Sequence, residues 1–161
     1  MSKLDSSLEL FLQRRLIATI ATQNEDRSIH MTAVWYLYEN GRFFIATSSK
    51  SRKARNAAAR SSASLMIDSR TPGKERGTTA TGTIAILTGA ASAEINHRIQ
   101  SRYLSPAALA DPSIGGFFAT FDDVTLQLTP DSWISWDMAA LDAQVFGGRL
   151  GGTPGYMLPL D

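Results

Sequence analysis

Apolar stretches with strand-like spacing recur along the chain and outline most of its expected structure. The nearly unbroken apolar run at 16–23 predicts a buried strand, and residues 28–39 predict the next one. Asn40-Gly41 follows directly, and because both residues accept positive φ, the pair predicts a tight hairpin that returns into 42–47. Three further strands are expected at 63–68, 78–88 and 124–137.

Helical spacing of apolar residues appears near the start of the chain and again between the predicted strands. The first helix is indicated by four residues on one face, Leu4, Leu8, Phe11 and Leu12. An alanine-rich stretch at 50–60 and the segment 92–104 predict two more helices, and 105–123 is expected to be a loop with at most one helical turn. Six antiparallel strands with these helices predict a small closed barrel decorated by helices.

Glycines mark two special places in this pattern. Gly82 lies inside a predicted strand, where a glycine indicates a bulge or a close approach of another backbone. The last 24 residues contain five glycines, Gly147, Gly148, Gly151, Gly152 and Gly155. We therefore expect one folded domain over 1–137 and an irregular, Gly-rich C-terminal tail over 138–161.

Composition narrows the class of protein. With 161 residues, 43% hydrophobic and 19% charged, the chain is typical of a single soluble globular domain. A formal net charge of +1 gives no whole-protein attraction to nucleic acid or to an acidic membrane. There is no cysteine, which fits a reducing compartment, and no apolar run approaches the roughly 20 residues that cross a bilayer. We expect a cytoplasmic protein without nucleic-acid or membrane partners.

Residues 47–60, "TSSKSRKARNAAAR", gather five basic and four hydroxyl side chains in fourteen residues of a nearly neutral chain, so the clustering is local. One interpretation is a solvated helix face. The other is an anion site, because the segment follows a strand and opens a helix, whose N-terminal N–H groups attract negative charge. Arg52 offers a planar fork of donors and Lys53 a point charge, and both suit a phosphate group.

The same segment resembles the phosphate-binding part of the pyridoxamine 5'-phosphate oxidase-like, FMN-binding split-barrel proteins. Thr47, Ser51-Arg52-Lys53, the alanine-rich helix and the strand at 63–68 follow that family's order, and "TGTI" and "LTPDSWISWD" have counterparts. The resemblance covers roughly residues 4–137. It implies a mainly β fold with helices, a six-stranded antiparallel split β-barrel, that forms a homodimer with FMN between the subunits.

The resemblance also implies roles for individual residues. Arg52 and Lys53 match the residues that grip the FMN phosphate, with Thr47 and Ser51 beside them, and Trp136 matches a tryptophan that reaches the flavin of the other subunit. The isoalloxazine edge would run along the backbone of the second strand at Met31, Thr32, Ala33 and Val34. No catalytic residue is assigned, because a bound flavin carries the two-electron chemistry and the protein positions a small planar substrate.

Departures from the family pattern leave two alternatives open. The chain lacks the basic residues that true pyridoxamine 5'-phosphate oxidases carry on the second strand and the substrate-gripping C-terminal segment, so vitamin B6 oxidation is not expected. Relatives that use the deazaflavin F420 carry a "K-x-R-N-L" segment similar to "KARNA" here, and F420 would recruit Arg55 and Arg60 as well. A non-catalytic flavin-binding or storage dimer is the other alternative. The two histidines, His30 and His97, are too far apart in the sequence to argue for a metal site.

Overall fold

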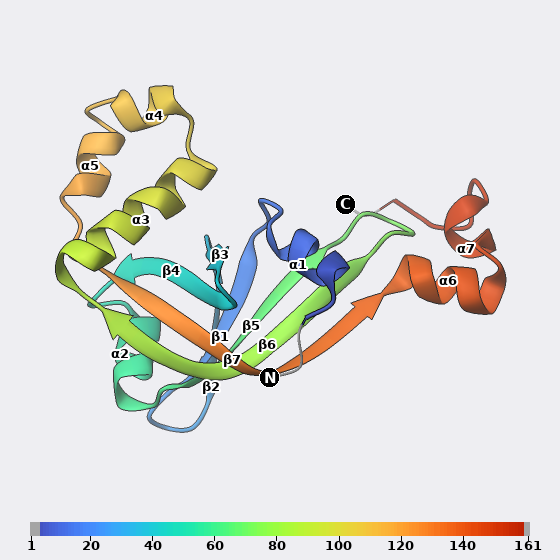
Figure 1. Cartoon of the computed structure of the whole chain (residues 1–161), viewed down its shortest axis with the longest axis horizontal. Helices are drawn as coiled ribbons and strands as arrows, with labels where there is room; N and C mark the ends of the chain where they lie inside the picture. The colour runs from blue at the N-terminus through green and yellow to red at the C-terminus, as the bar shows by residue number, and fades with distance from the viewer. Residues whose placement is uncertain (1–3, 160–161) are drawn as a thin grey trace.

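The computed structural model describes residues 4–159, which form one curled antiparallel sheet of seven strands with helices at both ends (Figure 1). The strand order is β2-β1-β5-β6-β7-β4-β3. The strands are β1 Ala18–Gln23, β2 Ile29–Val34, β3 Leu37–Glu39, β4 Arg42–Ser48, β5 Ser62–Ser69, β6 Arg76–Leu87 and β7 Asp123–Asp137. The helices are α1 Ser6–Leu12, α2 Arg52–Ala59, α3 Gly89–Tyr103, α4 Pro106–Ala110, α5 Gly115–Ala119, α6 Met138–Phe146 and α7 Arg149–Gly152.

The curl of the sheet follows from the connection between its two edges. β2 and β3 are the edge strands, yet only Trp35 and Tyr36 separate them in the chain. The step from Val34 to Leu37 spans at most about 10 Å, so the two edges must lie close together and the sheet must bend into a half-barrel. The single strand expected at 28–39 is therefore two strands, and the sheet has seven strands instead of six.

The expected hairpin and bulge are both present. Asn40 and Gly41 adopt positive φ values of 50° and 74° between β3 and β4. The pairing of β6 with β7 shifts register between Thr81 and Gly82. A Cβ at Gly82 would overlap the carbonyl oxygen of Thr129, so the close approach of β7 requires glycine there.

Two expectations about irregular segments are wrong. The segment between α3 and β7 holds two short helices, α4 and α5, and most of the segment after residue 137 is helical. "MAALDAQVF" is a good helix-forming sequence that Asp137 caps, and the first glycines, Gly147 and Gly148, take left-handed conformations between α6 and α7. Residues 1–3 and 160–161 of the expected domain and tail lie outside the described residues, and the boundary at residue 137 stays a prediction.

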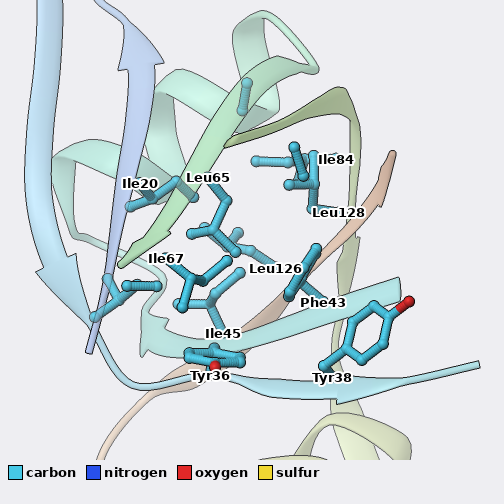
Figure 2. Packing of buried hydrophobic residues seen from close by; sticks show 14 of the residues in the cluster. Ile20, Tyr36, Tyr38, Phe43, Ile45, Leu65, Ile67, Ile84, Leu126 and Leu128 are labelled. Carbon is cyan, nitrogen blue, oxygen red and sulfur yellow. The ribbon is translucent and has the colours of Figure 1, made fainter. Parts of the chain in front are cut away.

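The hydrophobic core fills the concave side of the sheet (Figure 2). Four strands, β1, β4, β5 and β7, contribute the fully buried aliphatic residues Ile20, Ile45, Leu65, Ile67, Leu126 and Leu128. Tyr36 joins this core from the link between the sheet edges, and its hydroxyl donates to the carbonyls of Leu12 and Arg14 at 3.0 and 3.1 Å. Burial raises the pKa of Tyr36 to about 12. Tyr36 therefore fastens the end of α1 to the seam of the half-barrel.

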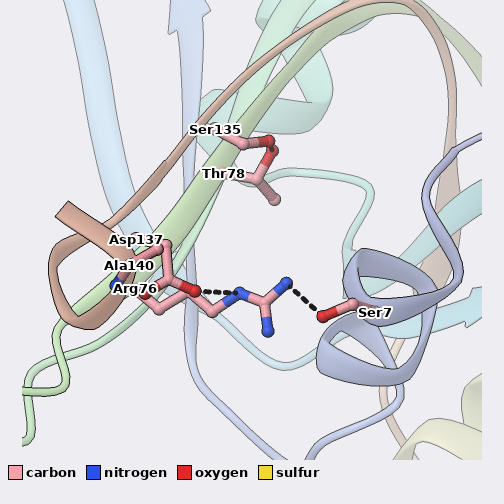
Figure 3. A network of polar contacts seen from close by, with 6 residues as sticks. All are labelled: Ser7, Arg76, Thr78, Ser135, Asp137 and Ala140. Carbon is pink, nitrogen blue, oxygen red and sulfur yellow. Dashed lines mark hydrogen bonds and ion pairs between the residues drawn. The ribbon is translucent and has the colours of Figure 1, made fainter. Parts of the chain in front are cut away.

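Arg76 connects α1 with the far end of β7 (Figure 3). Its guanidinium donates to the Ser7 hydroxyl at 2.9 Å and lies 3.5 Å from the Asp137 carboxylate. Asp137 in turn accepts from the backbone N–H of Ala140 at 3.0 Å and so caps α6. Figure 1 shows α6 and α7 at this end of β7 and α3, α4 and α5 beyond its other end. None of the helices in residues 4–159 is long and apolar enough to span a membrane.

Candidate functional site

The turn from β4 into α2 is shaped by hydroxyl groups. Ser51 is the N-cap of α2, and its hydroxyl accepts from the backbone N–H of Ala54 at 3.2 Å and from the Thr47 hydroxyl at 3.0 Å. Thr47 is itself buried on β4. The first backbone N–H groups of α2, on Arg52 and Lys53, have no acceptor within the helix because they open it. Thr47 and Ser51 thus fix the start of the helix, and their role in binding phosphate stays a prediction.

Asn56 anchors the same helix to the sheet. Its side-chain amide donates to the Thr22 hydroxyl at 3.1 Å and to the Asn24 side-chain oxygen at 2.9 Å. Asn56 and Thr22 are both buried. A polar residue inside "KARNA" thus holds α2 on β1 and fixes where its N-terminal residues point.

A cavity of about 410 Å³ lies against the N-terminal part of α2, and we call it the first cavity. Its lining combines the end of β2, the outer face of β4, helices α2, α3 and α5, and the start of β7. The lining residues are Ile17, Ala33, Val34, Trp35, Ala46, Ser48, Lys53, Ile99, Gln100, Phe118, Phe121 and Asp123. The wall is mostly apolar, with four polar side chains, the pattern typical of small-molecule sites.

Lys53 and Asp123 are the charged groups of the first cavity. Burial lowers the pKa of Lys53, and the negative charge of Asp123 opposes that shift. Burial and the neighbouring Asp122 raise the pKa of the Asp123 carboxyl, and Lys53 opposes that shift. The ion pairs within residues 4–159 lie elsewhere, so no carboxylate neutralises Lys53 by direct contact. The Lys53 ammonium is thus available to an anion in the cavity.

Arg52 faces a different depression, which we call the arginine groove. It has a volume of about 760 Å³ and lies between α2 and the turn from β1 to β2. Its lining brings together three arginines, Arg52, Arg55 and Arg60, with two acidic residues, Glu25 and Asp26. The structure therefore divides the predicted phosphate pair: Lys53 belongs to the first cavity and Arg52 to the arginine groove.

Only two of the four β2 residues expected to run along the isoalloxazine ring line the first cavity. Ala33 and Val34 line the first cavity, whereas Met31 and Thr32 lie farther along β2, and Met31 is 61% exposed. Because β2 is an edge strand, one side of its backbone has no strand partner in the sheet. Polar backbone groups at this edge are available to a ligand in the first cavity.

Trp136 does not join this site within one chain. It pairs with Gly77 near the end of β7, thirteen residues beyond Asp123 (136 − 123 = 13). A strand of that length spans up to roughly 40 Å. Figure 1 shows the two ends of β7 at opposite sides of the sheet. A contact of Trp136 with a ligand in the first cavity therefore requires a second subunit.

Sequence reasoning assigned no role at this site to several residues that line it. Phe118 and Phe121 come from the stretch 105–123, which the apolar pattern marks as a loop, whereas Gln100 lies on α3 and Asp123 is the first residue of β7. Their position beside Lys53 depends on the pairing of β4 with β7, which sets Ser48 opposite Asp123. The aromatic pair "FF" and the adjacent "FDD" were the available signal, since exposed aromatic residues in a loop often contact ligands.

A further hollow of about 390 Å³, the second cavity, lies between α3, α4 and α5. It shares Gln100, Phe118, Phe121 and Asp123 with the first cavity. Its other lining residues are Ala93, Asn96, His97, Leu109, Gly115 and Ala119. The two aromatic side chains thus form a wall with a hollow on each side.

Solved structures share this architecture. A conserved hypothetical protein, Rv2991 from Mycobacterium tuberculosis, matches with a TM-score of 0.71 and 22% identity over 88% of this chain and 89% of that one. An F420 reductase matches with a TM-score of 0.63 and 19% identity over 81% and 98%. The heme storage protein HutZ from Vibrio cholerae matches with a TM-score of 0.63 and 15% identity over 82% and 94%.

At these identities the solved structures establish the split-barrel fold alone. No curated protein sequence matches the chain. The family model described as pyridoxamine 5'-phosphate oxidase matches residues 4–137, from just before α1 to the last residue of β7. The match spans most of the sequence, and the chain therefore belongs to the pyridoxamine 5'-phosphate oxidase family.

Proposed function

We propose that this protein binds FMN, with the FMN phosphate at Lys53 and the N-terminal end of α2, and acts as an oxidoreductase on a small planar substrate. The observation that carries the proposal is the position of Lys53. It is a half-buried cation in a largely apolar cavity, and within residues 4–159 it has no carboxylate in direct contact. A buried ammonium is costly unless an anion accompanies it, so the site favours a ligand that carries one.

The residues around Lys53 fit the rest of such a cofactor. The open backbone edge of β2 at Ala33 and Val34 offers hydrogen-bonding groups to a heterocyclic ring, and Trp35 offers an aromatic face. The first N–H groups of α2 add donors for the phosphate beside Lys53. FMN, when bound, supplies two-electron transfer, while this chain binds the phosphate, orients the ring and keeps water from it.

We further propose that the protein acts as a homodimer through the convex face of the sheet. Two rows of side chains cross five strands on this face, and none of the ten is ionisable. They are Met31, Ala21, Ser64, Thr81 and Ser132 in one row and Ala33, Thr19, Met66, Thr79 and Ile134 in the other. Met31 and Ile134 are 61% and 73% exposed. An uncharged face of this extent favours association, and a second subunit would supply the Trp136 that the first cavity lacks.

The family match suggests that residues 1–137 form the cofactor-binding domain and that 138–161 are an addition to it. Within that addition, the buried Asp142 carboxylate accepts from the N–H groups of Leu150 and Gly151 at 2.9 and 2.8 Å. These bonds hold α7 against α6. Residues 138–159 of the addition thus form a small folded unit attached to the end of β7.

A second candidate cofactor is F420, and the arginine groove favours it. Arg52, Arg55 and Arg60 continue the positive charge beyond Lys53 along α2. A single phosphate would need only the cation of the first cavity, whereas the longer anionic tail of F420 would contact both that cation and the arginine groove. The similarity to an F420 reductase is consistent with this candidate.

The visible absorption spectrum and fluorescence of added FMN, titrated with the purified protein, test the proposal. We expect saturable binding by the wild type and a Kd raised about ten- to hundredfold by Lys53→Ala, the factor for loss of one charge-assisted bond of about 1.5–3 kcal/mol. Lys50→Ala is the matched control, because Lys50 is exposed and lies outside the first cavity. Equal Kd values for the wild type and Lys53→Ala would refute the phosphate assignment. Binding of FMN without turnover of any electron acceptor would favour the storage alternative.

A further inference from the structure

Helices α4 and α5 add little to the hydrophobic core of the barrel. Neither helix contains a buried residue. Together with α3 they enclose the second cavity, whose volume is about 390 Å³. An apolar cavity of about 150 Å³ is enough to hold benzene. The space between these helices therefore admits a ring system larger than a single benzene ring.

Aromatic side chains form the boundary between the two cavities. Phe118 and Phe121 pack edge to face, with ring centroids 5.8 Å apart and planes 74° apart. On the side of the first cavity, Phe118 lies 6.3 Å from Trp35, which stacks on Tyr103 at 5.0 Å with nearly parallel planes. A planar ring beside this wall would meet aromatic faces and edges, which favour flat aromatic ligands over aliphatic ones of equal size.

Polar groups at the junction of the cavities indicate the charge of the ligand. Gln100 and Asp123 line both cavities, and within residues 4–159 neither side chain has a hydrogen-bond partner. The remaining polar side chains of the second cavity are Asn96, already bonded to Thr125, and the exposed His97. Its lining contains no lysine or arginine, in contrast to Lys53 in the first cavity. The carboxylate therefore disfavours anions in the second cavity and favours donors of hydrogen bonds.

We propose that the second cavity binds a planar aromatic ring that carries an N–H donor and is neutral or cationic, with Asp123 and Gln100 as its polar partners. This inference goes beyond the proposed function and does not rest on it, because the aromatic wall separates the second cavity from a cofactor in the first cavity. Binding of the ring itself requires no cofactor. Phosphorylated and carboxylated aromatic compounds are thereby excluded as preferred ligands of this cavity.

Three probes of one ring and different charge test the inference on the cofactor-free protein at pH 7. Benzamidine is a cation, benzamide is neutral and benzoate is an anion. We expect calorimetry or ligand-observed NMR to show binding of benzamidine and benzamide, with benzoate at least about tenfold weaker than benzamidine, a difference of about 1.4 kcal/mol. Equal affinities for benzamidine and benzoate, or no binding of benzamidine, would overturn the proposal.

Variants locate the binding. Asp123→Asn should lower the benzamidine-to-benzoate affinity ratio about tenfold, whereas Asp122→Asn should lower it less than about threefold, because Asp122 faces neither cavity and bonds to Ser49. Ala119→Trp places an indole in the second cavity alone and should abolish binding, with Ala107→Trp on exposed α4 as its control. Benzamidine binding that survives in a folded Ala119→Trp variant would contradict the location, and an unchanged ratio in Asp123→Asn would contradict the role of that carboxylate.

Titration of FMN on the same samples separates the two proposals. Benzamidine binding without FMN binding would retain the second cavity as a ligand site and refute the proposed function. FMN binding without benzamidine binding would retain the proposed function and refute the ligand site.

Discussion

Arg52 and Lys53 are adjacent in the chain, yet their side chains line different cavities. They are the first two residues of α2, where successive side chains project about 100° apart around the helix axis. Lys53 therefore points into the first cavity beside Asp123, and Arg52 points into the arginine groove beside Asp26. A ligand that fills only the first cavity would contact one of the two cations.

This division predicts different responses of FMN and F420 to mutation. Lys53→Ala should raise the Kd of FMN about ten- to hundredfold, whereas Arg52→Ala should change it less than about threefold. For F420, Arg52→Ala should have an effect approaching that of Lys53→Ala, because the longer anion would reach the arginine groove. Fluorescence titrations of both cofactors with both variants measure this. Equal losses of FMN affinity in the two variants would show that Arg52 turns toward the first cavity when FMN binds.

Asp123 predicts a pH dependence of anion binding. Burial and Asp122 raise the pKa of its carboxyl above the ordinary value of 3.8, so the group ionises at a higher pH in the folded protein. Above that pH its charge repels an anion at Lys53, and below it the repulsion is lost. Asp123→Asn should therefore bind FMN more tightly than the wild type at pH 7, and the advantage should shrink as the pH falls.

The ratio of wild-type to variant Kd at each pH is the quantity to measure, because protonation of the FMN phosphate itself, with a pKa of about 6, affects both proteins. Asp123→Asn should also stabilise the folded protein at pH 7, and this gain should likewise disappear as the pH falls. The ionised carboxylate destabilises the folded state only above pH 3.8, so Asp123→Asn should raise the urea midpoint at pH 7 and not at pH 3. A ratio that stays constant from pH 7 to pH 4 would contradict the repulsion.

The sequence predicted the elements of the barrel better than it predicted the site. Strands such as 16–23 and the Asn40-Gly41 hairpin depend on local preferences that a single sequence displays. The break at Trp35-Tyr36 does not, because both flanking segments are apolar and only the closure of the sheet separates them into β2 and β3. The helix at 138–146 was missed because the glycines that follow it dominated the interpretation of the whole C-terminal segment.

At the site, charge and helix position marked Lys53 as a candidate, and the structure places it in the first cavity, while its contact with a phosphate stays a prediction. Asp123 and Phe118 were not predictable, since their contact with the first cavity arises from the register of β7 on β4 and from the return of α5 toward β2. The separation of Arg52 from Lys53 was not predictable either, because each cavity is lined by segments that lie far apart in the sequence. Long-range pairing, which one sequence does not display, decides each of these cases.

Asn56 should be important for stability. Asn56→Ala removes the bonds to Thr22 and Asn24 and leaves the buried Thr22 hydroxyl without this donor, which costs roughly 1–3 kcal/mol in the free energy of unfolding. Arg55→Ala is the matched control, because Arg55 is exposed on the same helix. Urea unfolding with an unchanged m-value measures the difference. A loss below about 0.5 kcal/mol for Asn56→Ala would show that water replaces these bonds.

Gly82→Ala and Gly116→Ala should change stability in opposite directions. A Cβ at Gly82 would overlap the Thr129 carbonyl, so the variant must distort the β6–β7 bulge, at a cost of about 1–3 kcal/mol. A Cβ at Gly116 meets no atom within 4 Å, and alanine stabilises a helix by up to about 1 kcal/mol relative to glycine. Thermal unfolding of both variants tests this. Equal melting temperatures would contradict the close approach at Gly82.

Trp136 should affect FMN binding only through the dimer. Its ring covers Gly77, and within its own chain it lies at the opposite end of β7 from the first cavity. Trp136→Ala should therefore weaken FMN binding at protein concentrations where the dimer forms and leave the residual affinity of dilute monomer unchanged. Ile134→Ala, on the same uncharged face, should weaken the dimer without removing an aromatic ring from the partner's cavity.

Sedimentation velocity and FMN titration over a range of protein concentrations distinguish these effects. In the wild type, FMN affinity should rise as dimer forms, and in Trp136→Ala this rise should be lost even where sedimentation shows dimer. Ile134→Ala should regain wild-type affinity once its concentration restores the dimer. If wild-type FMN affinity is the same in monomer and dimer, no residue of a second subunit completes the site, and Trp136 has only a structural role against Gly77.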